Sequence, residues 1–473
     1  MTSNILLSVA NSYRMPIRDK SVHCCVTSPP YFGLRKYSGD QGFEWPSVTY
    51  TPMSGLPSVT VEGMRSDLGL EPTPEAFVAH VVAIFREVWR VLRDDGTCWL
   101  NFGDSYAGSG KGQMGSGDAS DRRGAKQGTS AGTLTGGLPV GVSSNLKPKD
   151  LIGIPWRVAF ALQADGWYLR SDIIWKKNNP MPESVTDRCT KSHEHLFMLA
   201  KSKRYFYDAE AVKEPVADST IARLTQPSID KQIGSTRVPG KTNGNMKAVG
   251  ATDTRNKRDV WTIHTQSFRG AHFATFPAAL VEPCILAGTS ARGICPECES
   301  PWERVVSKGM STYAKIKQET GHNWSDMQAQ AEDNGTALKA GMPATGSTRL
   351  PNGTQPHLES ATSSTIGWRP TCSHYDRYDE WINTPRRKRG ESDESLNSRR
   401  AAALAIQVEL VEFWADAITV PAVVLDHFCG SGTTGQVSKA RGRRFIGLDM
   451  SVLYLADIAT KRVVAKLPKA MIP

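Results

Sequence analysis

The stretch VVLDHFCGSGTTGQVSKARGRRFIGLDMS, residues 423–451, decides the fold of this chain. Its apolar start predicts a strand, GSGTTG predicts a turn that opens a helix, and RRFIGLD predicts a second strand that ends at Asp449. The order strand, glycine turn, helix and strand is typical of a nucleotide-binding unit of an α/β protein.

The glycines of this stretch carry the binding signal. Gly430, Gly432 and Gly435 match G-x-G-x-x-G, and Asp449 follows the first glycine after 19 positions. Glycines let the backbone approach a cofactor, and an acidic side chain at the tip of the second strand accepts hydrogen bonds from ribose hydroxyls. The glycine pattern alone also fits an NAD or FAD enzyme.

The position of the glycine loop argues against a dinucleotide enzyme. Only 24 residues follow Asp449, too few to complete a doubly wound sheet. The other strands must therefore come from upstream, where VTSPPYFGL (26–34) follows the apolar run VHCCV. Prolines cannot continue a strand, so this strand ends at Ser28. We expect both loops at the carboxyl edge of one sheet, although taken alone SPPY also fits an ordinary strand-ending loop.

Two further segments predict the same kind of sheet. Residues 74–103 read as an amphipathic helix, an Asp-Asp-Gly turn and a strand, and residues 149–178 repeat this order with an Asp-Gly turn. Successive units of this kind imply parallel strands. Residues 104–147 are rich in glycine and serine without an apolar period, and we interpret them as a mobile loop.

Composition indicates the class of partner. The 473 residues carry a net charge of +10, which favours a polyanionic partner such as nucleic acid. The sequence has no long apolar run and no basic leader followed by an apolar core, so we expect a cytosolic protein without a membrane partner. The nine cysteines are scattered and odd in number, which fits reduced thiols.

Three motifs in order, TSPPY, HFATFP (272–277) and LDHFCGSGTTG, resemble the β group of S-adenosylmethionine-dependent DNA amino-methyltransferases, the N4-cytosine/N6-adenine family. The resemblance implies a circularly permuted Rossmann-like α/β sheet with inserted loops. His427 stands where the family often has proline, and Cys429 where a smaller residue is common.

The resemblance also implies a division of the chain. It places a catalytic part at 1–208, a target-recognition segment at 209–268, a segment that closes the cofactor pocket at 269–294 and the S-adenosylmethionine-binding part at 401–473. Cysteine and histidine residues at both ends of 295–375 separately suggest a zinc-stapled insertion there.

The SPPY motif suits methyl transfer to an amine. An exocyclic amine is a poor nucleophile because its lone pair is delocalised into the ring, and acceptors aimed at its N–H groups hold that lone pair out of conjugation. Ser28 Oγ and the Pro29 carbonyl are the candidate acceptors, Pro29 and Pro30 stiffen the backbone, and the Tyr31 ring can stack on a flipped base.

On the cofactor side, the resemblance places S-adenosylmethionine against residues of the middle and downstream motifs. These are Thr275, Phe276, Pro277, Asp426, Phe428, Gly430, Gly432 and Asp449. Taken singly, Phe276 also fits a core residue, and Asp449 also fits a helix cap.

Four further side chains form a candidate zinc site. Cys295 and Cys298 make a Cys-x-x-Cys, and Cys372 with His374 supplies two more ligands for a tetrahedral, structural Zn²⁺. These cysteines also fit free thiols.

The sequence thus predicts a site-specific methyltransferase that acts on double-stranded DNA in the cytoplasm of a bacterial or phage-infected cell, alongside a cognate restriction endonuclease. Serine before Pro-Pro-Tyr is commoner in N4-cytosine members of the family, so N4 of cytosine is preferred over N6 of adenine. The motifs fit less well a methyltransferase that acts on RNA or protein, or a non-catalytic DNA-binding protein with this fold.

Overall fold

The computed structural model describes residues 4–33, 41–107, 146–217, 219, 254–265, 276–308, 363–388 and 390–464. The chain divides into two compact units. The first comprises Met1–Ala211, Arg258–Trp302 and Ile418–Pro473, and the second comprises Val212–Lys257 and Glu303–Ala417. Most of the loop predicted over 104–147, and most of the segment predicted for target recognition, lie outside the described residues.

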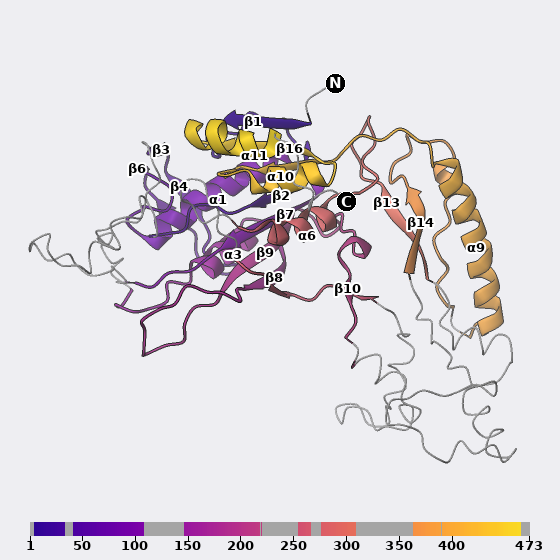
Figure 1. The fold of residues 1–473 in the computed structure, drawn as a ribbon, viewed down its shortest axis with the longest axis horizontal. Helices are drawn as coiled ribbons and strands as arrows, with labels where there is room; N and C mark the ends of the chain where they lie inside the picture. The colour runs from indigo at the N-terminus through magenta and orange to yellow at the C-terminus, as the bar shows by residue number, and fades with distance from the viewer. Residues whose placement is uncertain are drawn as a thin grey trace, which may run out of the picture. The chain divides into compact units, whose positions relative to one another are not determined.

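The first unit is built on an eight-stranded sheet of order β1-β16-β15-β2-β7-β9-β8-β12. Neighbouring strands are parallel except at β9, which runs antiparallel to β7 and β8. In the part of the sheet formed by β1, β16, β15 and β2, strands from the two ends of the chain lie side by side (Figure 1). The strands are β1 (Ile5–Val9), β2 (Val22–Thr27), β7 (Leu92–Phe102), β8 (Tyr168–Lys176), β9 (His193–Ala200), β12 (Val260–Thr262), β15 (Val423–Asp426) and β16 (Arg444–Asp449).

This order confirms the predicted permuted α/β sheet. The strand before Ser28 pairs in parallel with the strand before the glycine loop, through Cys24 with Val424 and Cys25 with Leu425. Parallel strands end at the same edge, so the two loops share the carboxyl edge of the sheet.

Helices cover both faces of the sheet. The helices are α1 (Pro74–Val91), α3 (Ile154–Ala164), α6 (Ala278–Gly288), α10 (Thr433–Ala440) and α11 (Thr460–Val464). Alternate residues of β7 separate the faces. Cys98 and Leu100 pack into the core with α1 and α3, whereas Thr97 lies against Gly288 of α6.

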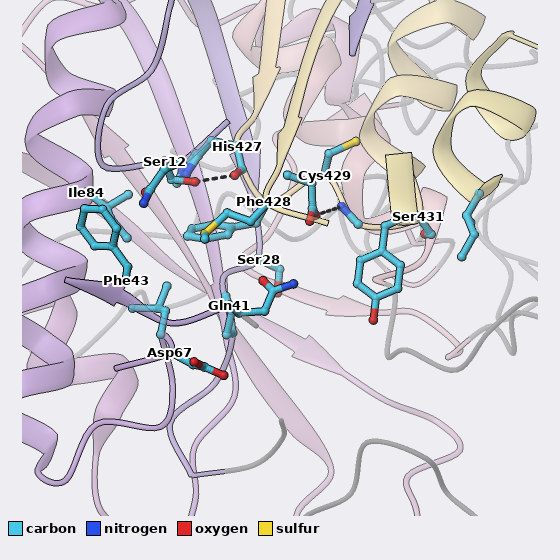
Figure 2. A pocket seen from close by; sticks show the side chains of 18 of the residues that line it. Ser12, Ser28, Gln41, Phe43, Asp67, Ile84, His427, Phe428, Cys429 and Ser431 are labelled. Carbon is cyan, nitrogen blue, oxygen red and sulfur yellow. Dashed lines mark hydrogen bonds between the residues drawn. The ribbon is translucent and has the colours of Figure 1, made fainter. Parts of the chain in front are cut away.

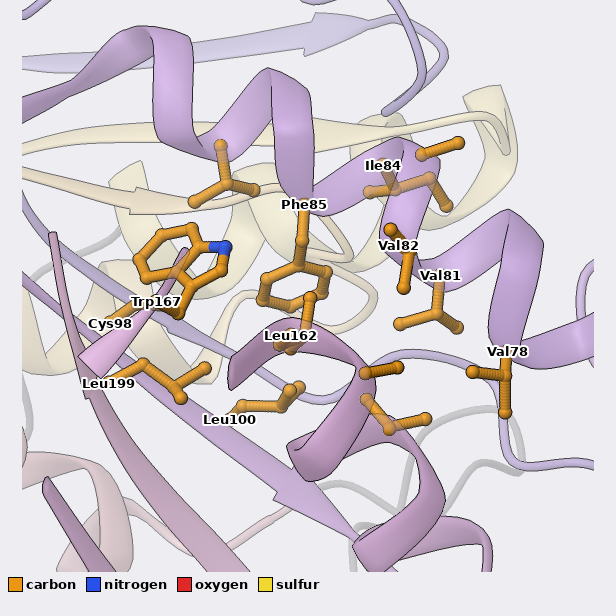
Figure 3. Packing of buried hydrophobic residues seen from close by; sticks show 14 of the residues in the cluster. Val78, Val81, Val82, Ile84, Phe85, Cys98, Leu100, Leu162, Trp167 and Leu199 are labelled. Atoms are coloured by element: carbon orange, nitrogen blue, oxygen red, sulfur yellow. The ribbon is translucent and has the colours of Figure 1, made fainter. Parts of the chain in front are cut away.

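The core between α1, α3 and the sheet is large and apolar. Phe85 of α1, Leu162 of α3 and Leu100 of β7 are fully buried, and they gather with Trp167 and Leu199 (Figure 3). Two residues explain why α1 begins at Pro74. Thr73 Oγ1 accepts a hydrogen bond from the Ala76 N–H at 3.1 Å and so caps the helix, and Pro74 is favoured in the first turn.

One local prediction was wrong. The Asp-Asp-Gly segment at 94–96 does not form a turn between α1 and β7, because β7 begins at Leu92, directly after the helix. Pairing with β2 passes from Leu92 to Thr97 with a shift of register, so these residues form an irregularity within the strand. The Asp165-Gly166 turn between α3 and β8 is confirmed.

In its described residues, the second unit has fewer helices and strands than the first. β13 (Glu303–Lys308) and β14 (Ser363–Arg369) form an antiparallel pair, and α9 (Asp393–Phe413) packs against β14. Two short strands, β10 (Glu214–Pro215) and β11 (Thr254–Arg255), form another antiparallel pair. Within the part of the chain that the structure describes, no helix has the length and apolar character needed to cross a membrane.

Candidate functional site

A pocket lies at the carboxyl edge of the sheet in the first unit, between the SPPY loop and the glycine loop. Figure 2 shows Phe43 and Ile84 on one side, Cys429 and Ser431 on the other, and Ser28 between them. Six predicted site residues line this pocket: Ser28, Pro30, Phe276, Phe428, Gly430 and Asp449. The pocket therefore brings together candidate residues from all three sequence motifs.

The remaining predicted residues of the SPPY and HFATFP motifs lie elsewhere. Pro29, the next residue after Ser28, is buried, and Pro277 is the buried residue that precedes α6. Thr275 lies outside the described residues.

Asp449 ties the tip of β16 to the glycine loop. Its Oδ2 accepts the Gly430 N–H at 2.8 Å, and its Oδ1 accepts the Ser451 N–H at 2.8 Å. Burial raises the pKa of Asp449, and these backbone donors oppose that rise. A carboxylate held this way at the pocket wall suits hydrogen bonds to hydroxyl groups of a bound nucleoside.

Asp426 accepts hydrogen bonds from residues of the glycine loop and does not line the pocket. Thr27 Oγ1 donates to its Oδ1 at 2.9 Å, and Thr434 Oγ1 donates to its Oδ2 at 2.7 Å. The Phe428 N–H donates to Oδ1 at 3.2 Å. Burial raises the pKa of Asp426 to about 6. Both oxygens are thus engaged by the protein, and one of their partners is the backbone of a pocket residue.

The glycines of the loop differ in surroundings. A Cβ added at Gly430 would meet nothing closer than the Phe428 carbonyl oxygen at 3.8 Å. A Cβ at Gly432 would lie 2.8 Å from Val463 Cγ2 and 3.1 Å from Ala459 Cβ, and Gly432 has a φ of +77°. Packing of the C-terminal helix and backbone conformation therefore account for the glycine at 432, which does not line the pocket.

Arg462 of α11 supports the same loop. Its guanidinium donates to Ser431 Oγ at 2.7 Å and to the Ser431 carbonyl oxygen at 3.1 Å, and also reaches Thr433 and Gln436. The C-terminal helix thus stabilises the glycine loop, a role that its local sequence pattern does not reveal.

The SPPY loop is joined to β7 and β9 by side-chain hydrogen bonds. Ser28 Oγ donates to the Tyr31 hydroxyl at 3.4 Å, and the Tyr31 hydroxyl donates to Glu194 Oε2 at 2.8 Å. Asn101 Oδ1 lies 3.2 Å from the same hydroxyl. Lys177 forms an ion pair with Glu194. Sequence reasoning did not identify Asn101, Lys177 or Glu194.

Sequence reasoning also missed one wall of the pocket. Asn11 and Ser12 follow the carboxyl end of β1, and Phe43, Trp45 and Asp67 come from the segment after the SPPY loop. Recognising residues 5–9 as a strand would have placed the first two, because polar residues after a parallel strand lie at the ligand-binding edge.

His427, which stands where the resembled family often has proline, is buried. Its ring is fully buried and lies 5.6 Å, centroid to centroid, from the Phe85 ring. Neither ring nitrogen has a hydrogen-bond partner among the described residues, and burial lowers the pKa of His427 to about 3. Its backbone carbonyl accepts the Ser12 hydroxyl at 2.7 Å. His427 is therefore a neutral side chain of the core.

The four predicted metal ligands come from both compact units. Cys295 is buried and Cys298 is partly buried in the first unit, whereas Cys372 is partly buried and His374 is exposed in the second unit. Three thiols and one imidazole are a usual set of ligands for zinc.

Comparison with known proteins agrees with this geometry. A family model described as DNA methylase matches residues 22–295 and 408–461, more than half of the chain. The Type II methyltransferase M.Cfr9I of Citrobacter freundii is 44% identical over 269 residues, which cover 57% of this chain and 67% of that protein. The Type II methyltransferase M.SfiI of Streptomyces fimbriatus is 27% identical over 446 residues, covering 93% of this chain and 86% of that protein.

The PvuII DNA methyltransferase (cytosine-N4-specific) aligns over 98% of this chain and 91% of its own, with 12% sequence identity and a TM-score of 0.41.

Proposed function

We propose, from the premise that this chain belongs to the DNA methylase family, that it transfers a methyl group from S-adenosylmethionine to an exocyclic amine of double-stranded DNA. One observation carries the proposal: Ser28 of the SPPY loop lines the same pocket as Gly430 and Asp449 of the glycine loop. An amine acceptor site and a nucleoside-binding loop that share a pocket bring two substrates together.

The residues of the pocket fit the cofactor. Phe428 and Phe43 offer aromatic surface, Gly430 leaves its side open, and Asp449 offers a carboxylate at the tip of β16. When bound, S-adenosylmethionine supplies an electrophilic methyl group on a sulfonium. We infer that Asp449 accepts hydrogen bonds from its ribose hydroxyls.

The acceptor side follows from Ser28 and the prolines. Ser28 Oγ and the Pro29 carbonyl accept hydrogen bonds from the amine, which keeps the nitrogen lone pair directed at the methyl group. As the N–CH3 bond forms, the S–CH3 bond of the sulfonium would break to leave a neutral thioether, and the methylated amine would release one proton to solvent. Pro29 and Pro30 fix the backbone before the base arrives. Because a base within the duplex cannot reach this pocket, the target base leaves the stack.

We infer N4 of cytosine as the acceptor in preference to N6 of adenine, because serine precedes the Pro-Pro-Tyr sequence. Methylation at C5 of cytosine requires a cysteine nucleophile. The Pro283-Cys284 dipeptide is inside α6, where Cys284 is fully buried and its thiol donates to the Leu280 carbonyl oxygen. That cysteine is a core residue and cannot reach a base.

Two partners belong to the proposal. The relatives named as Type II methyltransferases support a cognate restriction endonuclease that acts on the same DNA, in the cytoplasm of a bacterial or phage-infected cell. The Cys295, Cys298, Cys372 and His374 group holds one structural Zn²⁺, because three thiolates and one imidazole are a usual zinc ligand set and the transfer itself uses no metal.

The test uses the purified full chain with tritiated S-adenosylmethionine and mixed-sequence duplex DNA, with RNA and protein offered in parallel. We expect label in the duplex alone. No label in DNA overturns the proposal, label in RNA or protein reassigns the substrate, and DNA binding without label identifies a non-catalytic protein. Mass spectrometry of the nucleosides identifies the acceptor, and N6-methyladenine without N4-methylcytosine overturns the preference for cytosine.

The cofactor site has its own test by calorimetric binding of S-adenosylmethionine. We expect Asp449→Ala to weaken binding at least about tenfold, because the ribose loses its acceptor and Gly430 loses its anchor. Asp165→Ala is the control, since Asp165 pairs with Arg86 outside the pocket. Equal affinity of the two variants would remove Asp449 from the cofactor site.

A further inference from the structure

The hydrogen bonds behind the SPPY loop run in one direction. Glu194 is ion-paired with Lys177, and an ionised carboxylate accepts hydrogen bonds but cannot donate them. The Tyr31 hydroxyl has a single hydrogen, and Glu194 Oε2 at 2.8 Å is nearer to it than Asn101 Oδ1 at 3.2 Å. The Tyr31 oxygen is then left as an acceptor for the hydroxyl of Ser28, 3.4 Å away.

We propose that Glu194 is a positioning residue that directs these hydrogen bonds, so that Ser28 Oγ presents lone pairs rather than its hydrogen to the acceptor amine. A hydroxyl can donate one hydrogen bond, and the Ser28 hydroxyl donates its hydrogen bond to the Tyr31 hydroxyl. Ser28 lines the pocket, so its remaining lone pairs are available to the N–H donors of the amine. This inference rests on the proposed methyl transfer to an amine.

Several contacts hold Glu194 in this role. Lys177 engages Oε1, which leaves Oε2 for Tyr31, and the Lys177 ammonium lies 4.7 Å from the centre of the Trp175 ring. Glu194 and Trp175 are partners across β9 and β8. The Glu194 and Lys177 side chains are only 13% and 21% exposed, so water competes little for their hydrogen bonds.

Tyr31 is fixed from two other sides. Asn101 is 2% exposed, and its Nδ2 donates to the His195 carbonyl oxygen at 3.0 Å, which turns its Oδ1 toward the Tyr31 hydroxyl. Gly103 leaves room for the ring, because a Cβ there would lie 2.7 Å from Tyr31 Cε2. A tyrosine needed only for base stacking would not require a buried partner for its hydroxyl.

The experiment compares Glu194→Gln, Tyr31→Phe and the double variant. Glutamine keeps the size of Glu194 but can donate to Tyr31 and reverse the direction of the hydrogen bonds. Phenylalanine keeps the stacking ring and removes the link. Single-turnover methyl transfer is measured at saturating S-adenosylmethionine on a duplex that the wild-type protein labels, together with cofactor affinity and thermal unfolding.

We expect each single variant to be at least about tenfold slower in transfer, with cofactor affinity within about twofold of wild type. The double variant should be no slower than the slower single variant, because both changes break the same link. Asp172→Asn is the matched control, a partly buried carboxylate on β8 that pairs with His195, and it should transfer at the wild-type rate.

Two results overturn the inference while the proposed function stands: an active wild type with Glu194→Gln or Tyr31→Phe within about twofold of it, or a double variant whose loss is the product of the two single losses. A wild-type protein that labels no DNA overturns the proposed function, and this inference falls with it.

Discussion

Gly432 and Val463 lie so close together that a Cβ on Gly432 would sit 2.8 Å from Val463 Cγ2. This contact joins the glycine loop to the C-terminal helix α11. Gly432 belongs to a cofactor-binding pattern, but the absence of a side chain there is required by its packing against α11.

We predict that Gly432→Ala lowers the free energy of unfolding by about 2–4 kcal/mol, through left-handed backbone strain and overpacking against Val463. Gly442→Ala is the matched control. Gly442 has a φ of +68° but no atom within 4 Å of the added Cβ, so only the strain of about 1–2 kcal/mol applies. Urea unfolding measures both, and equal losses would contradict the packing contact.

The buried carboxyl of Asp426 predicts a dependence of stability on pH. Its folded pKa of about 6 lies above its ordinary value of 3.8, so the folded state holds the proton more tightly. Raising the pH from about 4 to 6 should therefore destabilise the fold, by about 3 kcal/mol at most from this group.

Asp426→Asn removes this titration, and its unfolding free energy should fall less over the same pH range. Asp449, whose pKa burial also raises, is present in both proteins and cancels in the comparison. Parallel curves for the two proteins in urea unfolding from pH 4 to 7 would show that Asp426 does not titrate in this way.

Gly103→Ala should slow methyl transfer at least about tenfold without weakening cofactor binding. The new Cβ would lie 2.7 Å from Tyr31 Cε2 and displace the ring from Glu194, whereas Gly103 does not line the cofactor pocket. In a Tyr31→Ala background the same change should have little further effect on transfer, because the ring is gone. A full additional loss there would place the effect of Gly103 elsewhere.

For the metal site, we predict about one zinc per chain by elemental analysis of purified protein. Cys295→Ser should lose the metal and unfold at a lower temperature, because zinc binding contributes to folding. Cys189→Ser is the control, since Cys189 is an exposed free cysteine. Metal-free wild-type protein, or zinc retained by Cys295→Ser, would reject the site.

Local sequence determined the units of the fold. Alternating apolar and turn residues were enough to identify the strand, glycine turn, helix and strand from Val423 to Asp449. The prolines predicted the end of the other strand at Ser28, one residue beyond the end of β2 at Thr27. The expectation that both loops share one sheet is confirmed by the parallel pairing of β2 with β15. Such features depend on neighbouring residues or on counting, so a sequence displays them directly.

Tertiary structure alone decided which side chains meet. Thr27 reaches Asp426 across 399 positions, and Tyr31 reaches Glu194 across 163. The sequence also suggested a turn at residues 94–96, where the chain instead continues in β7 through an irregularity in its pairing with β2. Contacts of this kind depend on strand order, helix packing and side-chain burial, which arise only when the whole sheet assembles, and no local period or spacing encodes them.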